Sequence, residues 1–206
     1  MKKILIALGF TLAAMSAQSA TLSLAESGPV VFTTVAGTGS PTGAHDVVVG
    51  ALGGTFGQLS ALNDTTFAVT FLGFEASRTN FFVSNGTSVA GSANFDATVG
   101  QTFFFDVAAG VIDFGFRGPI LTALNTDIKN QRIAYITNDG SYIDANTGNA
   151  YSFLIGFNDG DEIDGDYDDY VVGVSAVPVP AALPLMASAL GAFGIARRRN
   201  KAKAAK

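Results

Sequence analysis

The sequence predicts an all-β protein, an antiparallel two-sheet sandwich with a jelly-roll-like arrangement. Short runs of β-branched and aromatic residues recur along the chain, separated by Gly, Asn, Asp and Ser, and no long 3.6-residue period appears. Fifteen phenylalanines between Thr21 and Ala176 can form a sizeable core. The chain has no cysteine, so that core, or a bound metal, has to stabilise it without disulfides.

Nine strands are expected in the region between the two ends of the chain. In order they cover residues 30–34, 46–51, 66–72, 80–84, 102–107, 111–116, 132–137, 151–157 and 170–175. A short helix is expected only over residues 120–130. Asn85-Gly86, directly after a run of β-formers, is the turn signal that tight hairpins favour.

The alternation of side chains along these strands predicts which residues are buried. In a strand, successive side chains point to opposite faces of the sheet, so Phe104 should point away from its two phenylalanine neighbours. A platform for stacking sugars would more often use Trp and Tyr, and Trp is absent, so core packing is the better interpretation of the Phe run. The residues expected in the core are Phe67, Val69, Phe71, Phe103, Phe105 and Ile155.

The N-terminus has the three parts of a secretory signal peptide. Lys2-Lys3 is the positive region, residues 4–14 are apolar, and small residues at 17–20 allow cleavage after Ser19 or Ala20. The sequence therefore predicts a signal peptide over residues 1–20 that signal peptidase removes. One domain, residues 21–176, follows it.

Charge is divided sharply between this domain and the C-terminus. The domain contains all seventeen acidic residues of the chain and only four basic ones, so its net charge is −13, whereas the whole chain has −5. Such a surface repels nucleic acid and anionic membranes and favours divalent cations. The sequence therefore excludes nucleic acid as a partner.

The C-terminus, residues 177–206, has three parts in a fixed order. A Pro-containing start is followed by an uncharged apolar run over 181–196 and then by six positive charges. Residues 177–196 would extend roughly 30 Å as a helix, enough for the core of a bilayer. Three prolines near the start limit the well-formed helix to residues 185–196. The basic end would stay in the cytoplasm.

This order resembles the PEP-CTERM sorting signal of Gram-negative bacteria, in its VPxPA-type variant with Val179 where the commonest form has Glu. The resemblance implies processing by an exosortase, transient anchoring in the inner membrane, and delivery to the cell surface or to an extracellular, exopolysaccharide-rich matrix such as a biofilm. The residues that match the signal are Val177, Pro178, Val179, Pro180, Ala181, Arg197, Arg198 and Arg199.

The strongest candidate for a binding site is an acidic loop between the last two expected strands. Seven acidic residues fall within residues 159–169, and Ca²⁺ prefers six to eight oxygen ligands. The spacing is not that of an EF-hand, and a solvated acidic loop without metal is the alternative. The expected Ca²⁺ ligands are Asp159, Asp161, Asp164, Asp166, Asp168 and Asp169.

The same region resembles a motif of exported β-domains, GF(E/N)DG…GDxDY(N/D)D, which often precedes a sorting signal. Here Gly156-Phe157-Asn158-Asp159-Gly160 and the stretch 165–169 match it, with Asn158 in place of the usual Glu and Asp168 in place of the usual Asn. The resemblance implies no enzymatic activity.

Few residues suit catalysis. The one histidine, His45, lies beside Asp46 after a loop-like stretch, and no dinucleotide fingerprint or nucleophile elbow is present. We therefore expect an exported, non-catalytic surface or matrix protein. The alternative from another class is a Ca²⁺-dependent carbohydrate-binding module, and a glycosidase using two of the many carboxylates is a third.

Overall fold

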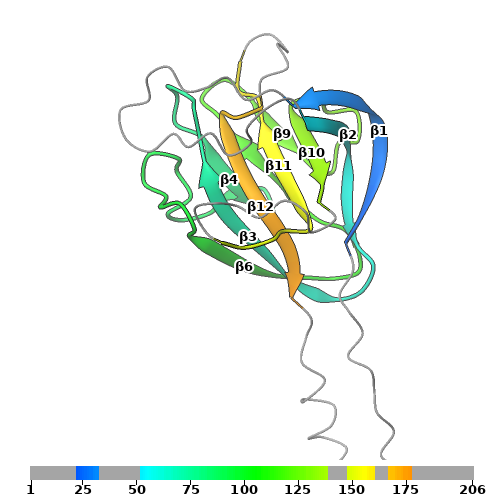
Figure 1. Cartoon of the computed structure of the whole chain (residues 1–206). Helices are drawn as coiled ribbons and strands as arrows, with labels where there is room; N and C mark the ends of the chain where they lie inside the picture. The colour runs from blue at the N-terminus through cyan, green and yellow to red at the C-terminus, as the bar shows by residue number, and fades with distance from the viewer. Residues whose placement is uncertain (1–21, 33–51, 139–147, 161–166, 178–206) are drawn as a thin grey trace, which may run out of the picture. The chain divides into compact units, whose positions relative to one another are not determined.

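The computed structural model describes residues 22–32, 52–138, 148–160 and 167–177, which are all-β with no helix (Figure 1). They form part of a compact unit over Ala20–Val177. Twelve strands are present in these ranges. They are β1 (Leu22–Phe32), β2 (Leu52–Ala61), β3 (Thr65–Gly73), β4 (Phe81–Ser84), β5 (Thr87–Ser88), β6 (Thr102–Val107), β7 (Gly110–Val111), β8 (Phe114–Arg117), β9 (Thr122–Leu124), β10 (Ile133–Thr137), β11 (Phe153–Phe157) and β12 (Tyr170–Val177).

The strands form two antiparallel sheets of unequal size. The larger has the order β1-β2-β10-β11-β12-β3-β6, with β7 added beside β2, and the smaller has the order β5-β4-β8-β9. Figure 1 shows β10, β11, β12, β3 and β6 side by side in the larger sheet. The two-sheet, all-β architecture expected from the sequence is therefore confirmed.

The core lies between the two sheets and is rich in aromatic rings. Phe67 of the larger sheet packs on Phe114 of the smaller one, with ring centroids 5.6 Å apart. Phe116 stacks on Phe157 across the same interface at 5.2 Å. Rings at these separations make favourable offset or edge contacts beyond the area they bury. The phenylalanine-rich composition therefore provides the contact between the sheets.

Five of the six residues expected in the core pack in it. Phe67, Val69, Phe71 and Ile155 are buried, and Phe105 is half-buried but contacts the core cluster. The sixth, Phe103, is only half-buried, because β6 is the edge strand of the larger sheet and no described strand pairs beyond it. Phe104 points outward as expected and is 63% exposed.

Several expected elements differ in the structure. Residues 120–130 are not a helix but contain β9 and turns, and the run 111–116 is divided between β7 and β8. Leu52–Ala61 forms a ten-residue strand that the sequence did not predict, and β1 begins at Leu22 instead of residue 30. The strand expected at 46–51 lies outside the described residues.

A second, smaller apolar cluster covers the other face of the larger sheet. It contains Leu72, Leu154 and Val171, which point away from the main core, with Tyr151 and Tyr167 packed over them. The ring of Tyr151 lies against Gly173, where an added Cβ would come within 2.4 Å of the ring. The middle of the larger sheet is therefore buried on both faces.

The strands β1 and β2 form a long, curved hairpin (Figure 1). Its register shifts between Glu26 and Gly28, which places a β-bulge in β1. A bulge bends the strand and increases its twist. Gly57 of β2 lies opposite this point, where an added Cβ would be 2.5 Å from the carbonyl oxygen of Ala25. Glycine therefore permits the close approach at the bend.

Candidate functional site

The acidic loop leaves the sheet where β11 ends and returns where β12 begins. At this base Phe157 and Asp168 form an isolated parallel bridge, so the two sides of the loop are held together. The carbonyl of Asp168 also accepts the backbone N–H of Glu75, 2.8 Å away, which fixes the loop base to the end of β3. The acidic segment therefore lies between two strands, as the sequence predicts, and backbone hydrogen bonds hold its base.

Asp159, the first acidic residue of the loop, is 5% exposed and already has several partners. Its Oδ2 accepts a hydrogen bond of 2.5 Å from Nδ2 of Asn80, and its Oδ1 lies 3.7 Å from Nη1 of Arg78. Its backbone N–H donates to Oδ2 of Asp169 at 2.7 Å. A buried carboxylate needs such compensation, and here it comes from protein groups.

Arg132 holds the same side of the loop. Its Nη1 donates to Oδ1 of Asn158 at 3.1 Å and to the carbonyl of Gly160 at 2.6 Å. Oδ1 of Asn158 also accepts the backbone N–H of Gly160 at 3.0 Å, so the amide closes a local turn. Two of the domain's four basic residues, Arg78 and Arg132, therefore stabilise the start of its most acidic segment.

Asn80 connects the smaller sheet to this base. It is fully buried, and its Oδ1 has no hydrogen-bond partner among the atoms that the structure describes. A Cβ added at Gly118 would lie 2.9 Å from that oxygen. The oxygen therefore faces the backbone of Gly118, while Nδ2 of the same amide binds Asp159.

The structure describes three of the six expected Ca²⁺ ligands. Asp159 and Asp168 are buried and Asp169 is half-buried, whereas the other three, Asp161, Asp164 and Asp166, lie outside the described residues. Within the ranges that the structure describes, no three acidic or histidine side chains gather where they could hold a metal ion together. The described part of the loop is thus its hydrogen-bonded base.

Of the expected sorting residues, only Val177 is described. It is the last residue of β12, it pairs with Thr66, and its carbonyl accepts a hydrogen bond of 3.0 Å from Oγ1 of Thr65. Residues 178–181 and 197–199 lie outside the described residues, as do His45 and Asp46. No helix long and apolar enough to cross a membrane occurs in the described ranges.

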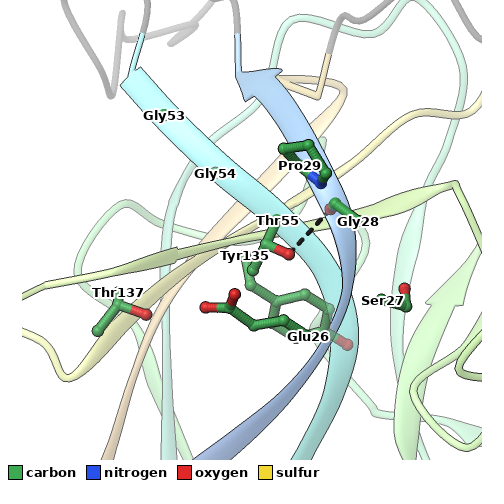
Figure 2. A pocket seen from close by; sticks show the side chains of 9 residues that line it. All are labelled: Glu26, Ser27, Gly28, Pro29, Gly53, Gly54, Thr55, Tyr135 and Thr137. Carbon is green, nitrogen blue, oxygen red and sulfur yellow. Dashed lines mark hydrogen bonds between the residues drawn. The ribbon is translucent and has the colours of Figure 1, made fainter.

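A pocket of about 530 Å³ lies beside the bend of the β1–β2 hairpin (Figure 2). Its lining comes from β1, β2 and β10. The residues are Glu26, Ser27, Gly28, Pro29, Gly53, Gly54, Thr55, Tyr135 and Thr137. The sequence did not reveal this pocket, because it depends on the missed strand β2. Its one local signal is Gly53-Gly54, which breaks the pattern of a strand.

Polar groups dominate the pocket. Oγ1 of Thr55 donates to the carbonyl of Gly28 at 2.9 Å, the bond drawn in Figure 2, and so fixes the bulged part of β1 to β2. Glu26, Ser27 and Thr137 are exposed at the rim. The ring of Tyr135 is buried in the core below, so no exposed aromatic ring lines the pocket.

Comparison of the sequence with protein-family models and with curated proteins found no match.

Proposed function

We propose that this chain is an exported, non-catalytic protein of the cell surface or extracellular matrix of a Gram-negative bacterium, associated with exopolysaccharide. Its jelly-roll-like sandwich is the mature domain, with a signal peptide before it and a membrane helix and basic cluster after it. Signal peptidase and an exosortase are its partners during export. The observation that carries the proposal is the sequence order of three parts at the C-terminus, a Pro motif, an apolar run and an Arg cluster.

The position of the domain's two described ends supports this proposal. Leu22, at the start of β1, pairs with Ala61, and Val177, at the end of β12, pairs with Thr66. The short turn between β2 and β3 separates these two pairs, so both ends leave at the same end of the sandwich (Figure 1). Both flanking segments can therefore be cleaved without cutting a strand.

Intact-mass measurement of the protein recovered from the cell surface tests the proposal. We expect a mature chain that begins at Ala20 or Thr21 and lacks residues 197–206. Replacing Pro178 and Pro180 together by alanine should leave unprocessed chain in the inner membrane, whereas Pro184→Ala, outside the motif, should not. Surface material that retains Arg197–Lys206 would contradict the sorting proposal.

A Ca²⁺-dependent carbohydrate-binding module is the second candidate. The observation that favours it is the density of acidic residues between β11 and β12, where seven fall within residues 159–169. Carboxylate oxygens are the ligands that Ca²⁺ prefers. The ligands would include Asp161, Asp164 and Asp166.

Thermal unfolding in millimolar CaCl₂ and in EDTA tests this candidate. A ligand that binds only the native state raises its stability by about 2.7 kcal/mol at a hundred times its Kd, so a bound Ca²⁺ raises the midpoint. The variant with Asp166→Asn and Asp168→Asn should lose that rise. Equal midpoints of the wild-type protein in the two buffers would leave the loop as a solvated acidic surface.

A further inference from the structure

The pocket at the bend of the β1–β2 hairpin is a gap in the larger sheet. Thr55 pairs with Tyr135, and no other residue pair joins β2 to β10 among the described residues. On its other side Thr55 pairs with Pro29, which has no N–H, so the peptide groups of Thr55 turn toward β10. Because peptide groups two residues apart on a strand point the same way, the peptide groups of Gly53 and Thr137 face the same gap.

Glycine keeps this gap open. A Cβ added at Gly28 or at Gly53 would meet no atom within 4 Å, so both positions border free space. Gly54 differs, because its added Cβ would lie 3.0 Å from the carbonyl oxygen of Tyr135. The pocket is thus bounded by backbone, and its volume of about 530 Å³ lies in the usual range for small-molecule sites, roughly 300–1,000 Å³.

The lining specifies the kind of ligand. It offers the carboxylate of Glu26, the hydroxyls of Ser27 and Thr137, and backbone N–H donors and C=O acceptors, but no Lys, Arg or His. Such a lining both donates and accepts hydrogen bonds, which matches a ligand that carries several hydroxyl groups. The carboxylate and the domain's net charge of −13 repel anions. We propose that this pocket binds a neutral saccharide residue.

In this assignment Glu26 accepts hydrogen bonds from adjacent hydroxyls of the sugar, and the hydroxyl of Thr137, on the same side of β1, binds a further ring substituent (Figure 2). A charged acceptor makes the strongest of these bonds. Acidic sugars such as uronic acids are excluded by charge. The inference deepens the proposed association with exopolysaccharide and rests on it for the source of the saccharide, but it needs neither the acidic loop nor Ca²⁺.

Saturation-transfer NMR on the full chain, in EDTA and a phosphocholine detergent without sugar groups, tests this site. The probes are neutral trisaccharides of glucose, galactose, mannose and N-acetylglucosamine, together with trigalacturonate. We expect at least one neutral probe to bind and trigalacturonate not to bind. Failure of all four neutral probes, or equal binding of trigalacturonate, would overturn the assignment.

Variants then locate the binding. Glu26→Gln should weaken it by about tenfold, the effect of losing one hydrogen bond to a charged group. Gly53→Leu should abolish it, because the side chain enters free space in the pocket without striking the backbone. Glu26→Gln, at an exposed position of the pocket, serves as the second test if Gly53→Leu fails to fold.

Controls match each substitution. Glu75→Gln removes the same charge outside the pocket lining, and Ala108→Leu places a leucine at an exposed position between β6 and β7. Both should bind as the wild type does. Full binding by a folded Gly53→Leu protein, or by Glu26→Gln, would refute the site. Loss of sorting with binding intact would instead contradict only the proposed function, because the binding assay is independent of export.

Discussion

The hydroxyl of Tyr135 donates a hydrogen bond of 2.7 Å to Oδ1 of Asn125 inside the core. The same oxygen accepts the backbone N–H of Leu59 at 2.7 Å, and Nδ2 donates to the carbonyls of Leu59 at 2.9 Å and Ile112 at 2.6 Å. The amide thus uses both donors and both lone pairs. It extends the hydrogen bonding of β2 next to β7, which pairs with β2 at Ser60 and Ala61.

Replacing Asn125 by leucine, which has a similar volume, should therefore destabilise the fold strongly. It leaves the N–H of Leu59 and the hydroxyl of Tyr135 unsatisfied, whereas the carbonyls of Leu59 and Ile112 keep hydrogen bonds from the N–H groups of Ile112 and Phe114. Each buried group left unsatisfied costs about 1–3 kcal/mol, so we expect a loss of more than about 2 kcal/mol. Urea unfolding measures it, with exposed Thr126→Ala as the control. A loss below about 1 kcal/mol would contradict the role of the amide.

Two of the buried tyrosines, Tyr135 and Tyr170, predict a loss of stability at high pH. Burial raises the pKa of Tyr135 and of Tyr170 well above the ordinary value of about 10. Above pH 10 the unfolded chain loses these protons while the folded chain keeps them, so ionisation favours unfolding. Stability is full below pH 10 and should fall above it by up to about 1.4 kcal/mol per pH unit for each tyrosine.

Urea unfolding between pH 9 and 11.5, a window chosen around that ordinary pKa, checks this. Tyr135→Phe should lower stability at neutral pH, because the hydrogen bond to Asn125 is lost. Above pH 10 its free energy of unfolding should also fall less per pH unit than that of the wild type. If the slope in the variant equals that of the wild type, Tyr135 does not contribute to the alkaline transition.

The alternation along β3 and β6 predicts opposite results for two phenylalanines. Phe71 is 1% exposed and packs on Tyr170, so Phe71→Ala should cost roughly 3–5 kcal/mol. Phe104 is 63% exposed on the other face, so Phe104→Ala should change stability by less than about 0.5 kcal/mol. Thermal or urea unfolding of the two variants compares them, and similar costs would contradict the assignment of faces.

Asp159 has a stabilising role that does not need a metal. Asp159→Ala removes the acceptor of Asn80 and the charge partner of Arg78, so in EDTA we expect a loss of about 1–3 kcal/mol. Exposed Asp113→Ala should have little effect. Unchanged stability of the Asp159 variant in EDTA, with a loss only in Ca²⁺, would instead indicate that the carboxylate acts as a metal ligand.

Strands with strong local patterns were predictable from the sequence. The run 102–107 matches β6 at both ends, and β3 differs from its prediction by one residue at each end. The turn at Asn85-Gly86 is confirmed, because both residues have positive φ, 49° and 72°, between paired Ser84 and Thr87. In these places local preference and tertiary packing agree.

Where the predicted secondary structure was wrong, tertiary contacts determine the structure that forms. Residues 120–130 form a strand and turns instead of a helix, because Asn125 must reach Leu59 and Ile112 across the core. β2 was missed because Gly53, Gly54 and Gly57 weaken its local pattern, while pairing with β1 over its whole length defines it. The pocket depends on this strand and so could not be predicted.

The last strand of the domain occupies a central place in the larger sheet. β12 lies between β11 and β3, and no other strand of that sheet joins the β3–β6 pair to β11. During synthesis from the N-terminus, the sheet therefore consists of two separate pieces until Tyr170–Val177 has been made. Such long-range pairing slows folding and delays it until the domain is complete. The incomplete chain exposes unpaired strand edges, which favour aggregation, throughout its translation.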